Sequence, residues 1–364
     1  MRVVPLPPHL PHHPLMDMLY TPMAALGVEV RRERPRVAIP ALLGGTGARV
    51  LHLHFFDEIV QRPSRAASLL RTLGLLGMLA GLRARGVVLI WTAHNMIPHE
   101  TYHPCLAARS YAAVAKLSHA TIAHGEAARA LVIQRYAPRR CVAIPLGNYI
   151  GAYGPPADRR DSRAALGLPQ DGPVSLCLGA LRRYKAIEVA IAAFAALPQN
   201  RRGVLLIAGP PKDARYTAEL RALVDGVAGV RFAPHTVADA DIPQYLAAAD
   251  LMVLPYRRLL TSAALLLAMS YGLPALAPDV PPVRELIDNG VDGWLFAGDA
   301  AADWGQPPSG APQLGAALGA ALEYQDGAAL GAAALARAAA LDWPTIAART
   351  VDVYRAALDN QLVP

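Results

Sequence analysis

Residues 174–185, Val-Ser-Leu-Cys-Leu-Gly-Ala-Leu-Arg-Arg-Tyr-Lys, join a short apolar run to a glycine and then to a basic segment. The apolar run has the length of a buried strand, and apolar residues at helical spacing follow from Ile187. A glycine at a strand end lets the backbone approach a ligand closely, and arginine and lysine side chains can reach a diphosphate. We therefore predict that Gly179, Arg182 and Lys185 bind phosphate groups. The alternative is a solvated basic loop.

This strand–loop–helix unit recurs along the whole chain. Strands that are buried on both faces and alternate with helices form parallel sheets covered by helices. The composition, 54% hydrophobic and 17% charged, excludes a disordered chain, and 364 residues exceed what one core usually supports. We therefore predict an α/β protein with two doubly wound, Rossmann-like domains. The predicted strands are 37–39, 50–55, 87–91, 120–122, 142–144, 174–178, 203–207, 230–232, 251–253 and 275–277.

A turn-rich polar stretch, residues 151–161, separates the two groups of strands. It predicts an N-terminal domain of residues 1–152 and a C-terminal domain of residues 153–341. Asp342 is a candidate N-cap for a final helix within residues 342–364. Ligands of doubly wound sheets bind at the carboxyl ends of the strands, so we expect two facing sheets to hold two substrates in the cleft between them.

Two of the three lysines follow the ends of predicted strands. Lys185 closes the stretch quoted above, and Lys212 follows Ile-Ala-Gly-Pro-Pro, residues 207–211. Gly209 belongs to this second strand end, where its backbone is also placed to approach a ligand. We include Gly209 and Lys212 among the predicted phosphate-binding residues.

A third strand end lies in the segment Leu-Met-Val-Leu-Pro-Tyr-Arg, residues 251–257. A helix is predicted to begin near Thr261 and Ser262, where a hydroxyl caps free N–H groups and the helix start attracts phosphate oxygens. Tyr256 is placed to stack on a base or to hydrogen-bond to a ribose. Taken alone, the segment is equally typical of an ordinary helix cap beside a strand-end aromatic residue.

The order of these motifs is specific. Gly-x-x-Arg-x-Tyr-Lys (179–185) precedes Ile-Ala-Gly, then Ala-Asp-x-x-Val-Leu-Pro-Tyr-Arg (249–257), Thr-Ser-x-x-x-Leu-x-Ala-Met-Ser-x-Gly-x-Pro (261–274) and Pro-Val-Arg-Glu-Leu-Ile-Asp-Asn-Gly (282–290). This order resembles the donor domain of glycosyltransferase family 4, closely over residues 174–296 and more loosely over 52–148 and the last helix. Those enzymes have the GT-B fold of two facing Rossmann-like domains, in which the last helix crosses back onto the N-terminal domain.

The resemblance implies a set of donor contacts. Around the diphosphate it places Gly179, Arg182 and Lys185. Near the nucleotide and sugar it places Tyr256, Thr261, Ser262 and Glu285. Many family members carry a Glu-x7-Glu pair where this chain has Leu259 and Leu267. A subset of bacterial polysaccharide enzymes shares the Pro-Tyr-Arg and Thr-Ser version, and the missing carboxylates leave the sugar contacts and the stereochemical class open.

Histidines and carboxylates follow two strand ends in the N-terminal half, in residues 52–57 and 91–100. His94 is predicted to act as a general base or to contact donor phosphate or sugar, and the resemblance agrees, since a histidine ending the corresponding strand commonly faces the donor sugar. If the reaction inverts, Asp57 or Glu100 is the first candidate for the base, with ordinary loop hydrogen bonding as the alternative. His54 and His99 are predicted to contact the acceptor. The histidine spacing does not match a metal site, and no metal is predicted.

Partners and location follow from charge and composition. The formal net charge is +7, but the arginines are scattered outside any nucleic-acid-binding motif, so no nucleic-acid partner is predicted. The three cysteines lack metal or disulfide spacing, and prolines interrupt the N-terminal residues, which predicts a cytoplasmic protein. The apolar segment 66–82 is interrupted by Arg71 and Thr72 and falls short of a spanning helix. It is either a core helix or an interfacial helix on an anionic membrane surface.

We therefore hypothesise a bacterial glycosyltransferase that needs no cofactor. Its donor is a UDP- or GDP-linked sugar. We expect its acceptor to be a lipid-linked saccharide in the synthesis of exopolysaccharide or cell-surface glycan. Two alternatives stay open: a sugar-nucleotide epimerase on the same fold, and a donor-binding partner protein without catalysis.

Overall fold

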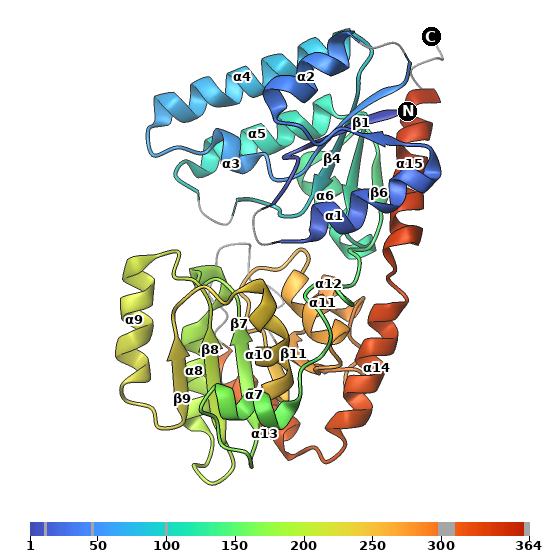
Figure 1. Ribbon diagram of the computed structural model, residues 1–364. Coiled ribbons are helices and arrows are strands. Elements are labelled where there is room, and N and C mark those ends of the chain that lie inside the picture. Colours follow the sequence, from blue (N-terminus) through green and yellow to red (C-terminus); the bar gives the residue numbers. More distant parts are fainter. Residues whose placement is uncertain (11–12, 45–46, 99–100, 298–309, 360–364) are drawn as a thin grey trace. The chain divides into compact units, whose positions relative to one another are not determined.

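The computed structural model describes residues 1–10, 13–44, 47–98, 101–297 and 310–359. Contacts divide the chain into two compact units, Met1–Gly147 with Leu341–Pro364, and Asn148–Ala340. Each unit is a six-stranded parallel sheet with helices packed against it (Figure 1). The predicted fold class, two doubly wound parallel sheets, is confirmed.

The sheet of the N-terminal unit has the strand order β2-β1-β3-β4-β5-β6. The order reverses between β1 and β3, which makes their carboxyl ends the point where ligands of such sheets bind. The strands are β1 (Arg2–Leu6), β2 (Glu29–Val30), β3 (Arg49–Leu53), β4 (Val88–Ala93), β5 (Ala120–Ala123) and β6 (Cys141–Ala143).

Helices cover this sheet, and the last helix of the chain is one of them. Helix α15 packs against α1, η1 and β4. A Cβ atom at Gly147 would clash with the ring of Trp343 at the start of α15, so only glycine fits there. The helices are α1 (Leu15–Tyr20), η1 (Pro22–Leu26), α2 (Pro35–Gly44), α3 (Asp57–Val60), α4 (Arg65–Ala84), α5 (Pro104–Leu117), α6 (Glu126–Tyr136) and α15 (Trp343–Asp359).

One predicted strand is wrong. Residues 37–39 lie inside α2 (Pro35–Gly44), which begins at a proline. Proline is favoured in the first helical turn, where its missing N–H leaves no hydrogen bond unmade. A run of three apolar residues does not distinguish a strand from a buried helical turn by periodicity.

The sheet of the C-terminal unit has the order β12-β11-β10-β7-β8-β9 and reverses between β7 and β10. Its strands are β7 (Val174–Leu178), β8 (Val204–Ala208), β9 (Val230–Ala233), β10 (Leu251–Val253), β11 (Ala275–Pro278) and β12 (Trp294–Phe296). The helices are α7 (Arg159–Ala165), η2 (Arg183–Lys185), α8 (Ile187–Ala196), α9 (Ala214–Val224), η3 (Asp239–Asp241), α10 (Ile242–Ala248), α11 (Ala263–Ser270), α12 (Pro281–Arg284), α13 (Ala311–Glu323) and α14 (Gly327–Ala339).

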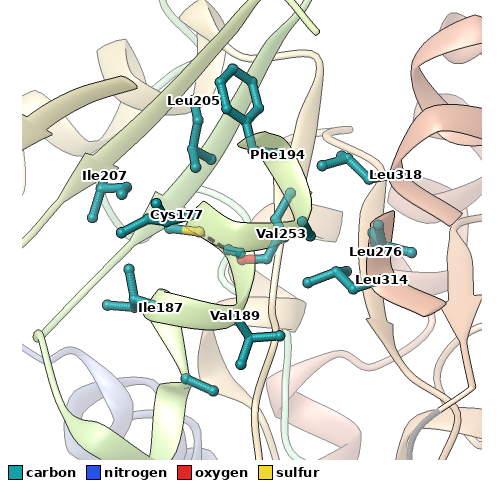
Figure 2. Packing of buried hydrophobic residues seen from close by; sticks show 14 of the residues in the cluster. Cys177, Ile187, Val189, Phe194, Leu205, Ile207, Val253, Leu276, Leu314 and Leu318 are labelled. Atoms are coloured by element: carbon teal, nitrogen blue, oxygen red, sulfur yellow. Dashed lines mark hydrogen bonds between the residues drawn. The ribbon is translucent and has the colours of Figure 1, made fainter. Parts of the chain in front are cut away.

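The core of this unit lies between the sheet and helices α8 and α13. Figure 2 shows Phe194 of α8, Leu276 of β11 and Leu314 of α13 within this cluster. The thiol of Cys177 donates a hydrogen bond to the Val253 carbonyl, 3.4 Å away, which ties β7 to β10 at the reversal point. Burial of each such large apolar side chain stabilises the unit by about 1.5–3 kcal/mol and fixes the strand ends that carry the candidate site.

Candidate functional site

The strand ends around β7 in the C-terminal unit bring predicted residues together. Gly179 follows β7, Gly209 follows β8, and Tyr256 lies just beyond β10. Because β7 lies between β8 and β10, these residues meet at the reversal point of the sheet, where a doubly wound domain binds its ligand.

Gly179 and Gly209 pack backbone against backbone. Their φ angles are +113° and +152°, and a Cβ atom on Gly209 would overlap the Gly179 carbonyl oxygen. A Cβ atom on Gly179 would lie only 2.7 Å from Nζ of Lys185. Glycine at both positions therefore lets the Lys185 ammonium group lie against the end of β7.

Lys185 is the most unusual charge in this unit. Only 9% of its surface is exposed, and its Nζ lies 5.5 Å from the centre of the Tyr256 ring. Within the described part of the chain, no carboxylate forms an ion pair with it. Burial, aided by the nearby charge of Arg182, lowers the pKa of Lys185 to about 8, against a smaller opposing effect of Cys177.

A small cavity of about 10 Å³ opens beside this ammonium group. A buried charge without a partner is costly, and a bound anion offsets that cost. The arrangement is therefore suited to an anionic ligand with an aromatic ring beside it. The lining residues are Cys177, Leu178, Gly179, Lys185, Ile187, Val253, Leu254, Pro255 and Tyr256.

The other predicted donor residues are placed differently. Arg182 is half-buried and close enough to influence Lys185, whereas Lys212 and Glu285 are exposed, the latter directly after α12. Ser262 caps α11, accepting a hydrogen bond from the Leu265 N–H at 3.1 Å, as the sequence predicts, and Thr261 before it is half-buried.

A network that the sequence did not reveal fixes the loop that carries Tyr256. The side chain of Arg257 donates to Glu188 of α8, which also accepts from the Tyr216 hydroxyl of α9. The Arg257 N–H donates to the Tyr184 carbonyl at 2.9 Å. Arg257 follows Tyr256 directly, so these bonds hold the aromatic residue against the Lys185 cavity.

The N-terminal unit carries a chain of histidines at the ends of β3, β4 and β5. His54 Nδ1 lies 2.9 Å from His94 Nε2, and His94 Nδ1 lies 3.2 Å from His124 Nε2. His124 Nδ1 in turn donates to the Ile144 carbonyl at 3.2 Å. Tyr20 continues the chain at its other end, because its hydroxyl lies 2.7 Å from His54 Nε2.

His52 joins the chain from the side. Its Nδ1 lies 2.7 Å from the hydroxyls of both Tyr20 and Tyr354, and its Nε2 lies 2.7 Å from the Thr92 hydroxyl. Tyr354 belongs to α15, so the last helix supplies part of this network.

Burial sets the charge of these rings, and one carbonyl sets their tautomers. Desolvation lowers the pKa of His54 to about 3 and that of His124 to about 4, so both are neutral at pH 7. Because the Ile144 oxygen only accepts, the proton of His124 is on Nδ1, and its Nε2 accepts from His94 Nδ1. His94 Nε2 then accepts from His54 Nδ1, and His54 Nε2 accepts from the Tyr20 hydroxyl.

The pKa values of His52 and His94 are also lowered well below the ordinary range, by burial and by the neighbouring histidines. Both ring nitrogens of His94 form hydrogen bonds within the chain of histidines. The Phe55 ring stacks on the His94 ring, with 4.1 Å between the ring centres. A cavity of about 20 Å³, room for a water molecule, is lined by all four rings and by Thr92.

The structure separates the predicted residues of this half. His54 and His94 contact one another, whereas the Asp57 carboxylate at the start of α3 accepts a hydrogen bond from the Tyr111 hydroxyl. His99 and Glu100 lie outside the described residues. Of the residues that the structure does describe, no group of three or more His, Cys, Asp or Glu side chains is placed to hold a metal ion.

Sequence reasoning missed His124, Tyr20 and Tyr354. His124 directly follows β5, so the rule that pointed to His94 after β4 would have found it. Tyr20 and Tyr354 belong to helices that are distant in sequence from the histidines, so no local pattern points to them.

The motifs at the Lys185 cavity match a known family. Residues 172–306 match the model of the family described as "Glycosyl transferases group 1". The C-terminal unit therefore contains a segment that is similar to group 1 glycosyltransferases. The predicted resemblance to glycosyltransferase family 4 is supported at this level.

Curated relatives align with more of the chain than this segment. D-inositol 3-phosphate glycosyltransferase of Kineococcus radiotolerans is 29% identical over 257 residues, 66% of this chain and 58% of that protein. The protein of the same name from Nocardia farcinica is 31% identical over 242 residues, 64% of this chain and 51% of that protein. The chain thus spans between half and three fifths of the length of these relatives.

Solved structures show the fold. Sucrose-phosphate synthase from Thermosynechococcus elongatus matches with a TM-score of 0.73 at 18% identity, over 99% of this chain and 100% of that one. Anabaena HepE in complex with UDP-glucose matches with a TM-score of 0.72 at 16% identity, over 98% and 100%. WaaG, a glycosyltransferase involved in lipopolysaccharide biosynthesis, matches with a TM-score of 0.66 at 19% identity, over 97% and 99%. The chain has the GT-B fold.

Proposed function

We propose that the chain is a glycosyltransferase that moves a sugar from a nucleotide diphosphate donor to a saccharide hydroxyl. The observation that carries this proposal is the buried Lys185 ammonium group, which lies between Gly179 and Tyr256 without a carboxylate partner among the described residues. It stands at the reversal point of a sheet, inside the segment that matches the group 1 family.

The charges at this site suit the chemistry of sugar transfer. The bond between the anomeric carbon and the phosphate oxygen breaks, and the diphosphate leaves with additional negative charge. A bond then joins the anomeric carbon to the acceptor oxygen, whose proton is released. Lys185 and Arg182 stabilise the departing diphosphate, and a fixed charge in a site of low polarity does so more strongly than one in water.

The neighbouring groups suit the rest of a nucleotide. The Tyr256 ring is held by the bonds of Arg257 and offers a face to a base or ribose. HepE has been crystallised with UDP-glucose and with UDP, so a UDP-linked sugar is the first donor to test. We propose a saccharide acceptor, lipid-linked, in the synthesis of a cell-surface polysaccharide.

We further propose a cytoplasmic location. Cys105, Cys141 and Cys177 are all free thiols, which fits a reducing compartment.

The test compares Lys185→Met with Lys116→Met, an exposed lysine of the other unit. Nucleotide binding is measured by thermal shift against UDP, GDP and their sugars, and release of the nucleotide is measured with and without a saccharide acceptor. We expect Lys185→Met to weaken binding and slow release by about 100-fold, because it removes a charge-assisted contact to the diphosphate. The Lys116→Met protein should behave as the unmodified chain does.

Unchanged binding in Lys185→Met would remove the assignment of the phosphate site. Donor binding without release of nucleotide under any acceptor would instead identify a donor-binding protein without transferase activity.

A further inference from the structure

Helix α4 (Arg65–Ala84) presents an apolar face to solvent. In the described part of the chain it is the one helix long and apolar enough to span a bilayer by length and composition. It is, however, packed into the N-terminal unit, on whose outer side it lies (Figure 1). The stripe that contacts β4, α3 and α5 consists of Ser68, Thr72, Leu75, Leu79 and Leu82.

The opposite side of the helix carries no polar side chain. At 100° per residue, Leu70, Leu73 and Gly77 lie opposite the buried stripe. Leu70 is 73% exposed, Leu73 58% and Leu69 47%. A Cβ atom added at Gly74 or Gly77 would meet nothing within 4 Å, so this side is open. The solvent face, as we call it below, comprises Ala66, Leu69, Leu70, Leu73, Gly74, Gly77, Ala80 and Ala84.

Arginines flank the solvent face, and the helix contains no acidic residue. Arg65 and Arg83 stand along one edge, and Arg71 and Arg85 along the other. None of these four forms an ion pair with a residue that the structure describes. The solvent face is therefore an apolar strip between two positive edges.

The positive charge extends beyond α4 at its C-terminal end. Arg83 donates to the Leu117 carbonyl and Arg139 to the Lys116 carbonyl at 3.0 Å, so both arginines gather at the end of α5. Burial, together with the charge of Arg139, lowers the pKa of Arg83.

We infer that the solvent face of α4 lies flat in the headgroup region of an anionic lipid bilayer. Exposed leucines insert among the upper acyl chains while flanking arginines pair with lipid phosphates, which is the pattern of an interfacial helix. The helix does not cross the bilayer in this fold, because Leu75, Leu79 and Leu82 are buried in the protein.

A second copy of the chain fits this face less well than lipid does. Pairing two solvent faces brings the arginine edges of both helices together, and α4 offers no carboxylate to neutralise them. An anionic surface supplies the missing negative charge along both edges at once. The inference rests on α4 and the adjoining end of α5, and it is independent of the donor site.

The experiment is flotation of the purified full chain with lipid vesicles. One set contains only phosphatidylcholine, and the other also contains phosphatidylglycerol, each at low and high salt. We expect flotation with the anionic vesicles at low salt and a marked loss at high salt, where surface attraction is screened. Absence of flotation with anionic vesicles at low salt would overturn the inference, and so would equal flotation with both lipids.

Two variants with matched controls test the residues. Leu70→Gln combined with Leu73→Gln should lower the bound fraction at least about tenfold, whereas Leu223→Gln, at a 45% exposed leucine of α9, should not change it. Arg65→Gln and Arg71→Gln should each lower affinity about fivefold, and Arg215→Gln, in α9, should not. All these positions are exposed, so melting temperatures should stay unchanged.

Flotation by the double leucine variant at the level of the unmodified chain would contradict the role of the solvent face. Light scattering on the same samples distinguishes the other occupant: a dimer that the leucine variant converts to a monomer, with no flotation, would assign the face to a second copy.

Discussion

The two units place ionisable groups at the same position in their sheets but treat them in opposite ways. Lys185 in the C-terminal unit is a buried charge to which no described carboxylate is paired. The four histidines of the N-terminal unit, His52, His54, His94 and His124, are buried and neutral. They bond to one another, to tyrosine and threonine hydroxyls and to one backbone carbonyl. One site lacks a counter-charge, and the other has its donors and acceptors matched.

This difference shows what each site can accept. The Lys185 cavity is stabilised by an anion, because binding supplies a charge that the protein does not. The histidine chain disfavours an added proton, because a second N–H on His94 or His124 would face a donor in place of an acceptor. A substrate contact at His94 must therefore replace either the bond from His54 or the bond to His124.

The largest expected effect is the response of the histidine chain to acid. The pKa values in the folded state lie below the unfolded value of about 6.5, so the unfolded chain binds more protons at mildly acidic pH. The free energy of unfolding is therefore undiminished by these histidines above pH 6.5, and it falls as the pH drops toward 4. His54 and His124 each contribute a loss of roughly 2 kcal/mol between pH 7 and pH 5.

Urea unfolding at pH 7 and pH 5 measures this loss, and imidazole C2–H resonances in NMR spectra assign it. The four rings should keep the chemical shifts of neutral histidine down to pH 5 in the folded protein. A ring of the chain that titrates between pH 7 and pH 6 would contradict the closed network.

The next largest effect tests how the chain is held together. The Tyr20 hydroxyl lies 2.7 Å from both His52 Nδ1 and His54 Nε2, so Tyr20→Phe leaves buried ring nitrogens without their partner. We expect a loss of about 1–3 kcal/mol in the free energy of unfolding. Tyr102→Phe, at a 58% exposed tyrosine of the same unit, should change it by less than about 0.5 kcal/mol.

The affinity for UDP should respond differently from the stability in this experiment. Because the Lys185 cavity is built from residues of the C-terminal unit alone, Tyr20→Phe should leave the affinity for UDP unchanged. A stability equal to that of the unmodified chain would show that the hydroxyl is not the link between the two histidines.

Much of the fold was predictable because its strands are short apolar runs buried on both faces, as in Val174–Leu178 and Val204–Ala208. Strands β1, β2 and β12, the last of only three residues, were not predicted. β1 contains Pro5, which removes a ladder donor and is unusual in a strand, and β2 has only two residues. The short run in α2 was mistaken for a strand because three residues carry no usable period.

The two sites also differ in how far local sequence predicts them. Gly179 and Lys185 are six positions apart, so local sequence places them at one strand end. The bond between His52 and Tyr354 spans 302 positions and depends on how α15 packs on the sheet, which no local pattern specifies. The network of Arg257 and Glu188 is likewise a product of packing between α8 and the loop after β10.

The smallest effect is the pH dependence of donor binding. Lys185 has a pKa of about 8 in the free protein, because burial and the charge of Arg182 disfavour its ammonium form. A bound diphosphate raises this pKa, since an adjacent negative charge favours the protonated lysine. By linkage, the affinity for UDP should be constant below pH 8 and fall by up to about tenfold per pH unit above it.

Calorimetric titration with UDP between pH 7 and pH 9.5 measures the slope, and Lys185→Arg is the matched control. A guanidinium group keeps its charge throughout this range, so the variant should bind UDP with an affinity that no longer falls above pH 8. The stability of the N-terminal histidine chain should not change over the same interval, because its rings are neutral there. If Lys185→Arg loses affinity above pH 8 as steeply as the unmodified chain does, the titrating group is not Lys185. The Lys185 cavity would then not be the site at which the missing counter-charge is supplied.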